Sequence, residues 1–316
     1  MNEKKSLVVP HIVAFLTVAV WGTTFVWTKL LLNNGLSPAQ IFTLRFVIAY
    51  LLLAGWWLRK EKNVKGLICK DEPIMAALGL TGGSLYFLSE NAAMLFTTAT
   101  NTSLIVCACP IFTAILIRLC YPITEKMGVW QWGGSVIALV GMAIVVLNGH
   151  FVLHLSPLGD ALAFIACMCW AVYSLIMRRV GERYSTIFVT RKVFFYGLLT
   201  IIPYHIIVEE DWPDLTTMCQ PVVWGNLLFL GCVASMVCYL CWNWCMVKLG
   251  AVNATNWVYF NPITTIVFAW LVLDEHITHF FLIGTALILA GIAIASSRKD
   301  TQYTLNRIEN SQLMSA

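Results

Sequence analysis

Charged residues are scarce in this chain. Only 11% of its 316 residues are Asp, Glu, Lys or Arg, whereas 59% are hydrophobic. Soluble domains are about 25% charged and about 45–50% apolar, and a chain of this length could not hide so much more apolar surface from water. The composition excludes an ordinary soluble protein and predicts an integral membrane protein, with the lipid bilayer as a partner and no nucleic-acid partner.

Familiar catalytic signatures are also missing. The sequence contains no phosphate-binding P-loop, no zinc-protease helix motif and no nucleophile elbow. We therefore expect neither an ATPase nor a hydrolase, and we predict a protein that is not an enzyme and has no cofactor. His276 and His279 stand beside Asp274 and Glu275, but one short loop is a poor source of ligands, so no metal site is predicted.

A disulfide framework and a cleavable signal are not expected either. Most of the 11 cysteines lie in apolar runs, whereas disulfide frameworks belong to small secreted domains. Cys238 and Cys241 are spaced as a C-x-x-C pair on an apolar helix, which favours small buried side chains over metal or redox ligands. No small-residue cleavage site follows the first apolar run, so that run is predicted to remain as a span.

Ten apolar runs are long enough to cross a bilayer, which takes about 17–25 helical residues. They cover residues 11–31, 39–58, 74–96, 99–119, 130–148, 158–177, 187–208, 222–247, 251–273 and 280–297. A polar tail, residues 298–316, follows the last run.

The basic residues indicate how these helices are oriented. Lys and Arg lie in the two terminal segments and in every second loop, while the opposite loops contain none, and one of those loops reads VEEDWPDL. Cytoplasmic loops of membrane proteins carry an excess of Lys and Arg. Both termini are therefore predicted to be cytoplasmic, with residues 298–316 as a cytoplasmic tail.

The two halves of the chain resemble each other. The segment ENAAMLFTTATNTSLIVCACPI aligns with WNWCMVKLGAVNATNWVYFNPI at a constant offset of 152 residues. Further matches are Trp21 with Trp170, Arg45 with Arg191, Gly134 with Gly284, and Gly141 with Gly291. Helices 1–5 (residues 11–148) thus correspond to helices 6–10 (residues 158–297). Since five is odd, the second copy must enter the membrane from the other side.

This pattern predicts an all-α integral membrane protein with ten transmembrane helices in two inverted-topology five-helix repeats. Many secondary transporters are built in this way, with the substrate site between the repeats near the middle of the bilayer. The paired glycines lie seven residues apart on one helix face, so we expect them to let a neighbouring helix approach closely.

Several stretches resemble the EamA family of the drug/metabolite transporter superfamily over residues 11–297. They are WGTTFVWTK, LSPAQIFTLRF, SPLGDALAFIACMCWAVYSLIMRR and PITTIVFAWLVLDEHITHFFLIGTALILAGIAI. The resemblance implies ten helices, a cavity lined mainly by helices 1, 3, 4, 6, 8 and 9, and export of small metabolites, often amino acids, by alternating access. It also implies the cytoplasmic (inner) membrane of a bacterium. Glu90 is not part of the general family pattern, so no role is carried over to it.

Glu90 is the most informative single residue. A charge inside a bilayer costs about 2.5–3.5 kcal/mol on insertion scales, so it needs a reason to be there. Arg45 on the second helix lies at a similar predicted depth, which leaves two interpretations open. Either the two residues form a structural ion pair, or Glu90 faces the cavity and holds a substrate amine or a proton. The interpretations predict different protonation states for Glu90, and they coexist if Arg45 is released in one conformation. The residue that matches Glu90 in the second half is Trp242.

Other polar and aromatic residues of the predicted cavity helices are candidate substrate contacts. Asn91 and Asn243 are symmetry-related amides, which either contact substrate or form hydrogen bonds between helices. Aromatic side chains stack on apolar or ring-bearing substrates or hold a cation, and the alternative for each of them is packing. The aromatic candidates are Trp21, Tyr86, Trp170, Tyr173, Tyr239 and Trp257.

Pro110 and Pro262 occupy matched positions inside the fourth and ninth helices. Each proline removes one backbone hydrogen bond and permits a kink. We expect either a hinge for rocking of the two halves or a static bend.

The sequence thus predicts a secondary active exporter of small, amino-acid-like or aromatic molecules, with protons as a candidate coupling ion. A phosphorylated-metabolite or nucleotide-sugar exchanger is the alternative, but it would need several cavity cations, and only Arg45, Arg191 and Lys29 are available. A membrane enzyme using Glu90 as general acid or base would need a second catalytic group at matching depth. A passive channel and the choice between monomer and homodimer stay open.

Overall fold

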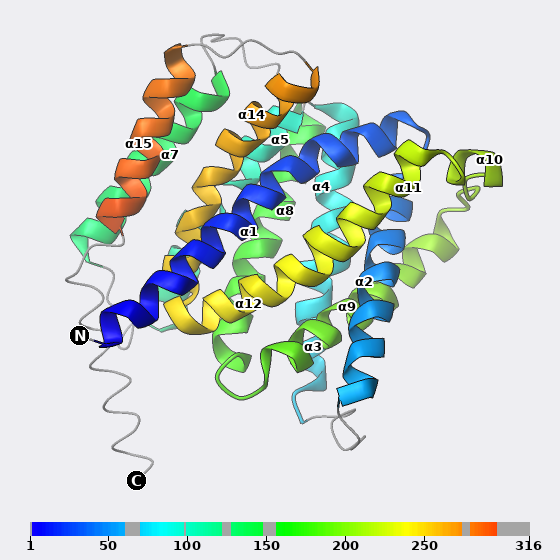
Figure 1. Ribbon diagram of the computed structural model, residues 1–316, viewed down its shortest axis with the longest axis horizontal. Coiled ribbons are helices and arrows are strands. Elements are labelled where there is room, and N and C mark those ends of the chain that lie inside the picture. The colour runs from blue at the N-terminus through cyan, green and yellow to red at the C-terminus, as the bar shows by residue number, and fades with distance from the viewer. Residues whose placement is uncertain are drawn as a thin grey trace.

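The computed structural model describes residues 2–60, 70–97, 99–121, 128–147, 156–273 and 279–295. Within these ranges the chain is helical and contains no strand (Figure 1). The predicted tail, residues 298–316, and the loop residues Asp274, Glu275 and His276 lie outside the described residues.

The helical elements follow one another along the whole chain. They are α1 (Asn2–Asn33), α2 (Pro38–Lys60), α3 (Glu72–Gly79), η2 (Leu80–Ser84), α4 (Leu85–Phe96), α5 (Ala99–Val106), α6 (Cys109–Cys120), α7 (Val129–Leu147), α8 (Pro157–Val180), α9 (Thr186–Ile207), α10 (Leu215–Met218), α11 (Pro221–Leu228), η3 (Phe229–Val237), α12 (Cys238–Leu249), α13 (Ala251–Thr255), η4 (Asn256–Phe260), α14 (Asn261–Leu273) and α15 (His279–Ala295).

Five of these helical stretches are long and apolar enough to cross a membrane. They are Val8–Asn33, Pro38–Trp57, Pro157–Val180, Thr186–Ile207 and Pro221–Leu249. Shorter apolar helices cover Cys109–Cys120, Val129–Ile144 and Leu282–Ala295. The predicted all-helical membrane fold is confirmed at this level, and the described residues of each predicted run fall on one helix or on consecutive helices. That ten segments cross the bilayer stays a prediction.

Local sequence explains where several helices begin and end. Gly35 and Gly250 have φ values of 88° and 81°. Only glycine adopts this backbone region readily, and here it lets the chain turn after α1 and after α12. At the start of α9, Ser185 is the N-cap, and its side-chain oxygen accepts a hydrogen bond from the Phe188 amide at 3.3 Å. Such a cap satisfies one of the free amides of the first turn.

Two stretches of consecutive helices, α3 to α4 and α11 to α12, contain a π-helical segment in their middle, which we call a wide turn. In η2, between α3 and α4, the amide of Leu85 donates to the carbonyl of Leu80, five residues back. In η3, between α11 and α12, the amide of Cys238 reaches the carbonyl of Val233 in the same way. Gly83 in η2 leaves helical geometry, with φ −129° and ψ −108°. Wide turns of this kind often lie at functional sites.

The helices that carry Pro110 and Pro262 are also interrupted. α5 ends at Val106 and α6 starts at Cys109, so Pro110 is the second residue of a new helix. Likewise, α13 passes through the tighter turn η4 before α14 begins, with Pro262 as its second residue. Regular helix is thus broken beside both prolines, which have no amide to donate to the preceding turn. That these places act as hinges stays a prediction.

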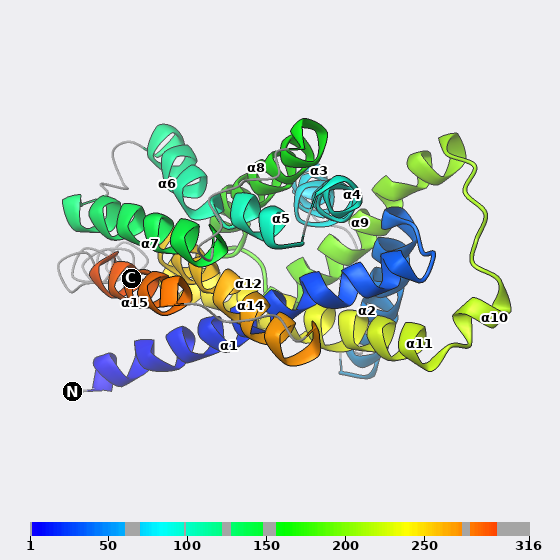
Figure 2. The same cartoon turned by 90° about the horizontal axis from the view of Figure 1, so that it is seen from above.

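Glycines bring α7 and α15 close together, and the two helices lie side by side in both ribbon views (Figures 1 and 2). A Cβ atom added to Gly134 would lie 2.5 Å from the carbonyl oxygen of Gly291. One added to Gly141 would lie 2.7 Å from the carbonyl oxygen of Gly284. The predicted packing role of these four glycines is confirmed, since no larger residue fits at this distance.

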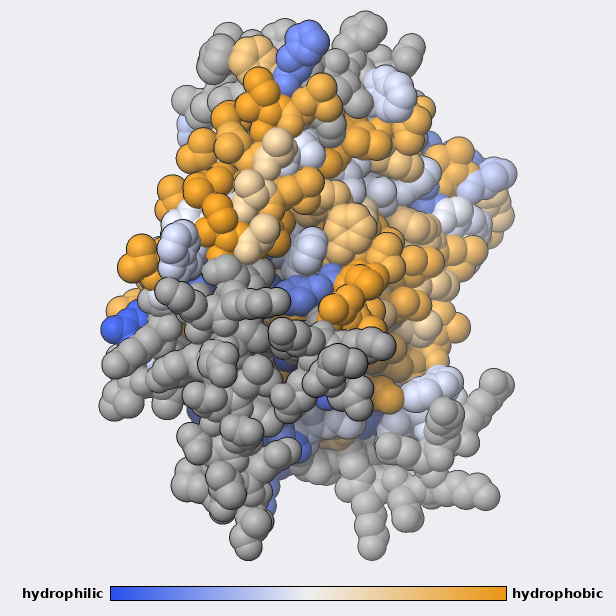
Figure 3. Space-filling model, turned by 60° about the vertical axis from the view of Figure 1, so that its left-hand side comes forward, coloured by the Kyte–Doolittle hydropathy of each residue, from blue (hydrophilic) through white to orange (hydrophobic). Residues whose placement is uncertain are grey.

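The other helices pack against one another in pairs and small groups. α1 packs against α12 and α14, and α8 packs against α4 and α6. α2 contacts η3 and α9, and α3 contacts α9. The face shown in Figure 3 is largely apolar where its residues are described. Large exposed apolar side chains occur on helices throughout the described part of the chain, for example Leu16, Leu51, Leu119, Ile207 and Leu289. An apolar surface of this extent suits contact with lipid.

Candidate functional site

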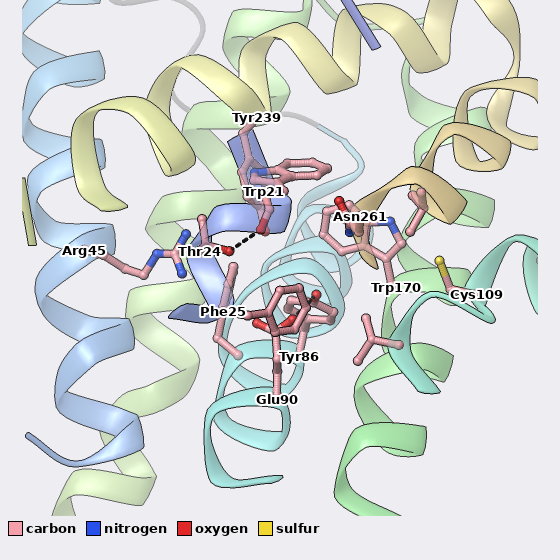
Figure 4. A pocket seen from close by; sticks show the side chains of 13 residues that line it. Trp21, Thr24, Phe25, Arg45, Tyr86, Glu90, Cys109, Trp170, Tyr239 and Asn261 are labelled. Atoms are coloured by element: carbon pink, nitrogen blue, oxygen red, sulfur yellow. Dashed lines mark hydrogen bonds between the residues drawn. The ribbon is translucent and has the colours of Figure 1, made fainter. Parts of the chain in front are cut away.

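A pocket lies at the centre of this arrangement and takes its walls from helices far apart in the sequence (Figure 4). It holds about 450 Å³ of space, its mouth included. Its 13 lining residues are Trp21, Thr24, Phe25, Arg45, Tyr86, Phe87, Glu90, Val106, Cys109, Trp170, Tyr239, Val258 and Asn261. They come from α1, α2, α4, α5, α6, α8, α12, η4 and α14.

Glu90 is one of the two charged residues of the pocket wall. It lies on α4, where its side chain is 7% exposed. The hydroxyl of Tyr86, one helical turn earlier, donates a hydrogen bond to its carboxylate at 2.6 Å. Residues four apart share a helix face, so α4 itself sets this pairing. Tyr86 thus gives Glu90 a neutral hydrogen-bond donor inside the fold.

Arg45 is the other charged residue and enters from α2 (Figure 4). Its Nε donates a hydrogen bond to Ser235 Oγ at 2.9 Å, and its guanidinium lies 4.3 Å from the centre of the Phe87 ring. A cation over an aromatic face is attracted by the electron-rich ring, most strongly where water is excluded. Arg45 is therefore held by a hydroxyl and a ring rather than by an acid.

The ion pair between Arg45 and Glu90, one of the two interpretations from the sequence, is not formed in this structure. Each charged group has instead a neutral partner close to it, which directs the arginine toward η3 and the carboxylate toward Tyr86. An acid and a base thus line one pocket without forming a direct ion pair. Charged groups inside a bilayer are costly, which is why these two residues are candidates for a functional role.

Four of the predicted aromatic residues meet at the pocket. The rings of Trp21 and Trp170 are 5.3 Å apart at 88°, and those of Tyr86 and Trp170 are 5.1 Å apart at 48°. Tyr239 completes the group, 5.9 Å from Trp21 at 69°. Tilted and edge-on contacts of this kind are the favoured arrangement of aromatic pairs. The result is a wall of rings beside the two charged groups.

The two predicted asparagines do not line the pocket. Asn243 is fully buried, accepts a hydrogen bond from the Tyr173 hydroxyl at 2.6 Å and donates one to Thr190 at 2.9 Å. Asn91 donates to the carbonyl of Pro38 at 3.1 Å. Both amides link neighbouring helices here, which is the alternative that the sequence left open. Tyr173, bonded to Asn243, likewise lies outside the pocket wall.

Trp257 and the two prolines are also outside the wall. The Trp257 indole donates to His11 Nδ1 at 3.0 Å, on the α1 side of the bundle. Pro110 and Pro262 are buried, but each directly follows a lining residue, Cys109 and Asn261 respectively. The prolines are therefore chain neighbours of two pocket residues without lining the pocket themselves.

The remaining cations named from the sequence lie elsewhere. Lys29 donates to the carbonyl of Met94 at 2.7 Å, near the end of α4. Arg191 lies over the Trp57 ring at 4.0 Å. Next to it, Lys192 forms an ion pair with Glu72 at 2.6 Å, joining α9 to α3. Of the three candidate cavity cations, Arg45 is the one that lines the pocket.

Seven lining residues were not predicted from the sequence: Thr24, Phe25, Phe87, Val106, Cys109, Val258 and Asn261. The internal repeat contains the signal that would have found several of them. Phe87 and Tyr239, Val106 and Val258, and Cys109 and Asn261 are each 152 positions apart, which is the offset of the repeat alignment. With Trp21 and Trp170, eight lining residues form four matched pairs.

Comparison with known proteins agrees with this picture. The model of the EamA-like transporter family matches residues 9–147 and 157–297. An uncharacterised transporter of Archaeoglobus fulgidus is 24% identical over 303 residues, which cover 95% of this chain and 99% of that protein. A probable terminal-alkyne amino-acid exporter of Streptantibioticus cattleyicolor is 23% identical, with 90% and 92% covered.

A solved structure supports the fold. One crystal structure aligns with a TM-score of 0.72 at 18% identity, covering 91% of this chain and 97% of that one. At this identity the likeness concerns the fold alone. The family match over both halves, the related transporters and the apolar helices show that this chain belongs to the EamA-like transporter family and is a multi-pass membrane transporter of that type.

Proposed function

We propose that this protein is a secondary active transporter that exports amino-acid-like or aromatic molecules across the cytoplasmic membrane of a bacterium. The observation that carries the proposal is the pocket wall, with an acid and a base that form no ion pair with each other and with six aromatic rings. Arg45 can bind a carboxylate and Glu90 can bind an amine or a proton. The rings can receive an apolar or aromatic side chain.

Alternating access between two inverted five-helix repeats, residues 11–148 and 158–297, is the proposed mechanism. The glycine contacts support it, since Gly134 packs on Gly291 while Gly141 packs on Gly284. Each of these contacts is the repeat image of the other, as at an interface with two-fold symmetry. The wide turns η2 and η3 lie at matched repeat positions as well. These features favour ten membrane helices around a site shared by both halves.

The proposed orientation places both termini in the cytoplasm. Lys and Arg gather in the terminal segments and in alternate loops, as the positive-inside rule describes. The proposed direction of transport is export, and the proposal applies to a monomer and to a homodimer alike. Protons are the coupling ion that Glu90 favours, because a carboxylate can take up and release one.

A phosphorylated metabolite or nucleotide sugar suits this pocket less well. A phosphate group needs several cations or amide donors to replace its hydration. Arg45 is the one Arg or Lys among the 13 lining residues. The printed name of the relative from Streptantibioticus cattleyicolor points in the same direction, because it describes an amino-acid exporter.

Uptake into proteoliposomes tests this function. We expect radiolabelled L-phenylalanine or L-leucine to accumulate above its external concentration when a pH gradient is imposed. Glucose 6-phosphate and UDP-glucose serve as probes of the alternative class. Equilibration without accumulation would indicate a passive channel, and accumulation of only the phosphorylated probes would contradict the proposed substrate class.

A further inference from the structure

The two wide turns receive hydrogen bonds from side chains that line the pocket. The indole Nε1 of Trp21 donates to the carbonyl of Ala234 in η3 at 2.9 Å. The hydroxyl of Tyr239 donates to the carbonyl of Gly82 in η2 at 2.5 Å. Trp21 and Tyr239 are both lining residues of the pocket.

The two acceptors occupy equivalent places in the repeat. Gly82 and Ala234 are 152 positions apart, the same offset that relates Asn91 to Asn243. Each lies inside a turn where backbone bonds reach five residues back instead of four. In such a turn a carbonyl can accept a side-chain donor as well as an amide.

Each donor comes from the opposite half of the chain. Trp21 on α1 belongs to the first half and bonds to the second, while Tyr239 on α12 belongs to the second half and bonds to the first. The donors are not repeat images of each other, because Trp21 matches Trp170 and Tyr239 matches Phe87, which has no hydroxyl. Equivalent carbonyls are thus held by different side chains, each crossing between the halves.

The surroundings of both turns leave little freedom. A Cβ atom added to Gly82 would lie 2.3 Å from the ring of Tyr173, so the turn is pressed against α8. In η3, Ser235 is the hydrogen-bond partner of Arg45, directly after the carbonyl that Trp21 holds. A substrate that contacts Trp21, Arg45 or Tyr239 therefore contacts a group that also fixes a wide turn.

We propose that Trp21 and Tyr239 are positioning residues that couple occupancy of the pocket to the two wide turns. Each side chain holds the turn of the opposite half, and movement of its ring on substrate binding releases or tightens that turn. The proposed coupling depends on the proposed transport function only where it concerns the transport rate. The hydrogen bonds and their effect on the turns are independent of substrate identity.

Hydrogen exchange in lipid nanodiscs without added substrate gives the first test. Tyr239→Phe removes only the hydroxyl, and we expect exchange in residues 80–86 to speed up by about fivefold, the effect of one lost neutral hydrogen bond. Exchange in 229–237 should not change. Trp21→Phe should show the reverse, with faster exchange in 229–237. Tyr259→Phe, which removes another buried tyrosine hydroxyl of the second half, should alter neither segment.

Uptake and binding of L-phenylalanine give the second test. Tyr239→Phe should lower the transport rate of this probe by about fivefold, the worth of one hydrogen bond, and by more than it weakens binding of the probe. Equal exchange changes in both segments, no local change, or an unaltered transport rate would overturn the proposal. Each variant could speed up hydrogen exchange only in its own segment while the wild-type protein does not transport phenylalanine. In that case the positioning role stands and the proposed substrate class is wrong.

Discussion

The hydroxyl of Tyr86 donates a hydrogen bond to the carboxylate of Glu90 at 2.6 Å, and both side chains line the central pocket. Tyr86 thus holds the acid in place, and Arg45 is bonded to Ser235 instead. The partner of the carboxylate is therefore neutral. A substrate amine or a proton can bind Glu90 without first breaking an ion pair with Arg45.

Tyr86→Phe should leave a folded protein with impaired transport. A hydrogen bond to a charged group contributes about 1.5–3 kcal/mol, so its loss should reduce the rate of phenylalanine uptake by about tenfold or more. The phenylalanine ring keeps the contacts with Trp170 and Phe87, which limits any change in packing. Size-exclusion chromatography checks assembly, and uptake equal to wild type would show that Glu90 does not depend on this hydroxyl.

Lysine should not be able to replace Arg45. Arg45→Lys keeps the positive charge but loses the planar group that lies over Phe87 and reaches Ser235. We expect both Arg45→Lys and Arg45→Gln to weaken binding of a carboxylate-bearing probe by about tenfold or more. Phenethylamine, which lacks the carboxylate, should bind the variants as it binds wild type. An equal loss for both probes would point to a structural role.

The contact between α7 and α15 should tolerate no side chain at its glycines. Gly141→Leu places a side chain 2.7 Å from the backbone of α15, and overpacking of this kind costs about 1–3 kcal/mol. Gly133→Leu, on the same helix, meets nothing within 4 Å and serves as the matched control. We expect a lower thermal midpoint for the first variant only. Equal midpoints would mean that the two helices separate without loss of stability.

Cys109 offers a native probe of the pocket. It is buried but lines the cavity, whereas Cys120 at the other end of α6 is exposed. A small methanethiosulfonate reagent should modify Cys109 about tenfold more slowly when phenylalanine is present at ten times its Kd, because only the free state reacts. Modification of Cys120 should be unchanged. Mass spectrometry of the two peptides measures both rates, and identical Cys109 rates with and without phenylalanine would place the substrate elsewhere.

The helical architecture and the charged centre of the site could be predicted from the sequence. Apolar runs report directly on the bilayer, and Arg45 and Glu90 stood out because a charge inside a membrane is costly. The aromatic residues of the pocket were proposed because they lie on the helices that the EamA resemblance places around the cavity, and Trp21 and Trp170 also occupy matched positions in the repeat alignment. These signals depend on local composition and on spacing along one chain.

The partners of these residues were not predictable in the same way. Ser235 and Phe87 hold Arg45 through contacts between helices, and nothing in their local sequence marks them. Asn91 and Asn243 face neighbouring helices instead of the pocket, because an amide in an apolar interior takes the nearest partner. The wide turns also depend on tertiary packing, since a helix shifts its backbone bonds only when its neighbours support the new geometry.

One carboxylate outside the membrane is a useful reference for pH experiments. Hydrogen bonds from the side chain of Thr217 and from Thr216 lower the pKa of Asp214 to about 2. Its contribution to the loop helix α10 is therefore present above about pH 4 and is lost only as the pH falls toward 2. Asp214→Asn should leave the pH dependence of transport between about pH 5 and 8 unchanged, and a shift in that profile would implicate the loop.

The response of uptake to an imposed pH gradient, compared between wild type and Glu90→Gln, is the most direct measurement. Glutamine keeps the shape of the side chain and its bond with Tyr86 but cannot carry a proton or a charge. Glu209→Gln, an exposed acid in the loop after α9, is the control. The account predicts gradient-driven phenylalanine uptake in wild type and Glu209→Gln and its loss in Glu90→Gln, with all three proteins equally assembled in the membrane. Unchanged gradient-driven uptake in Glu90→Gln would contradict it.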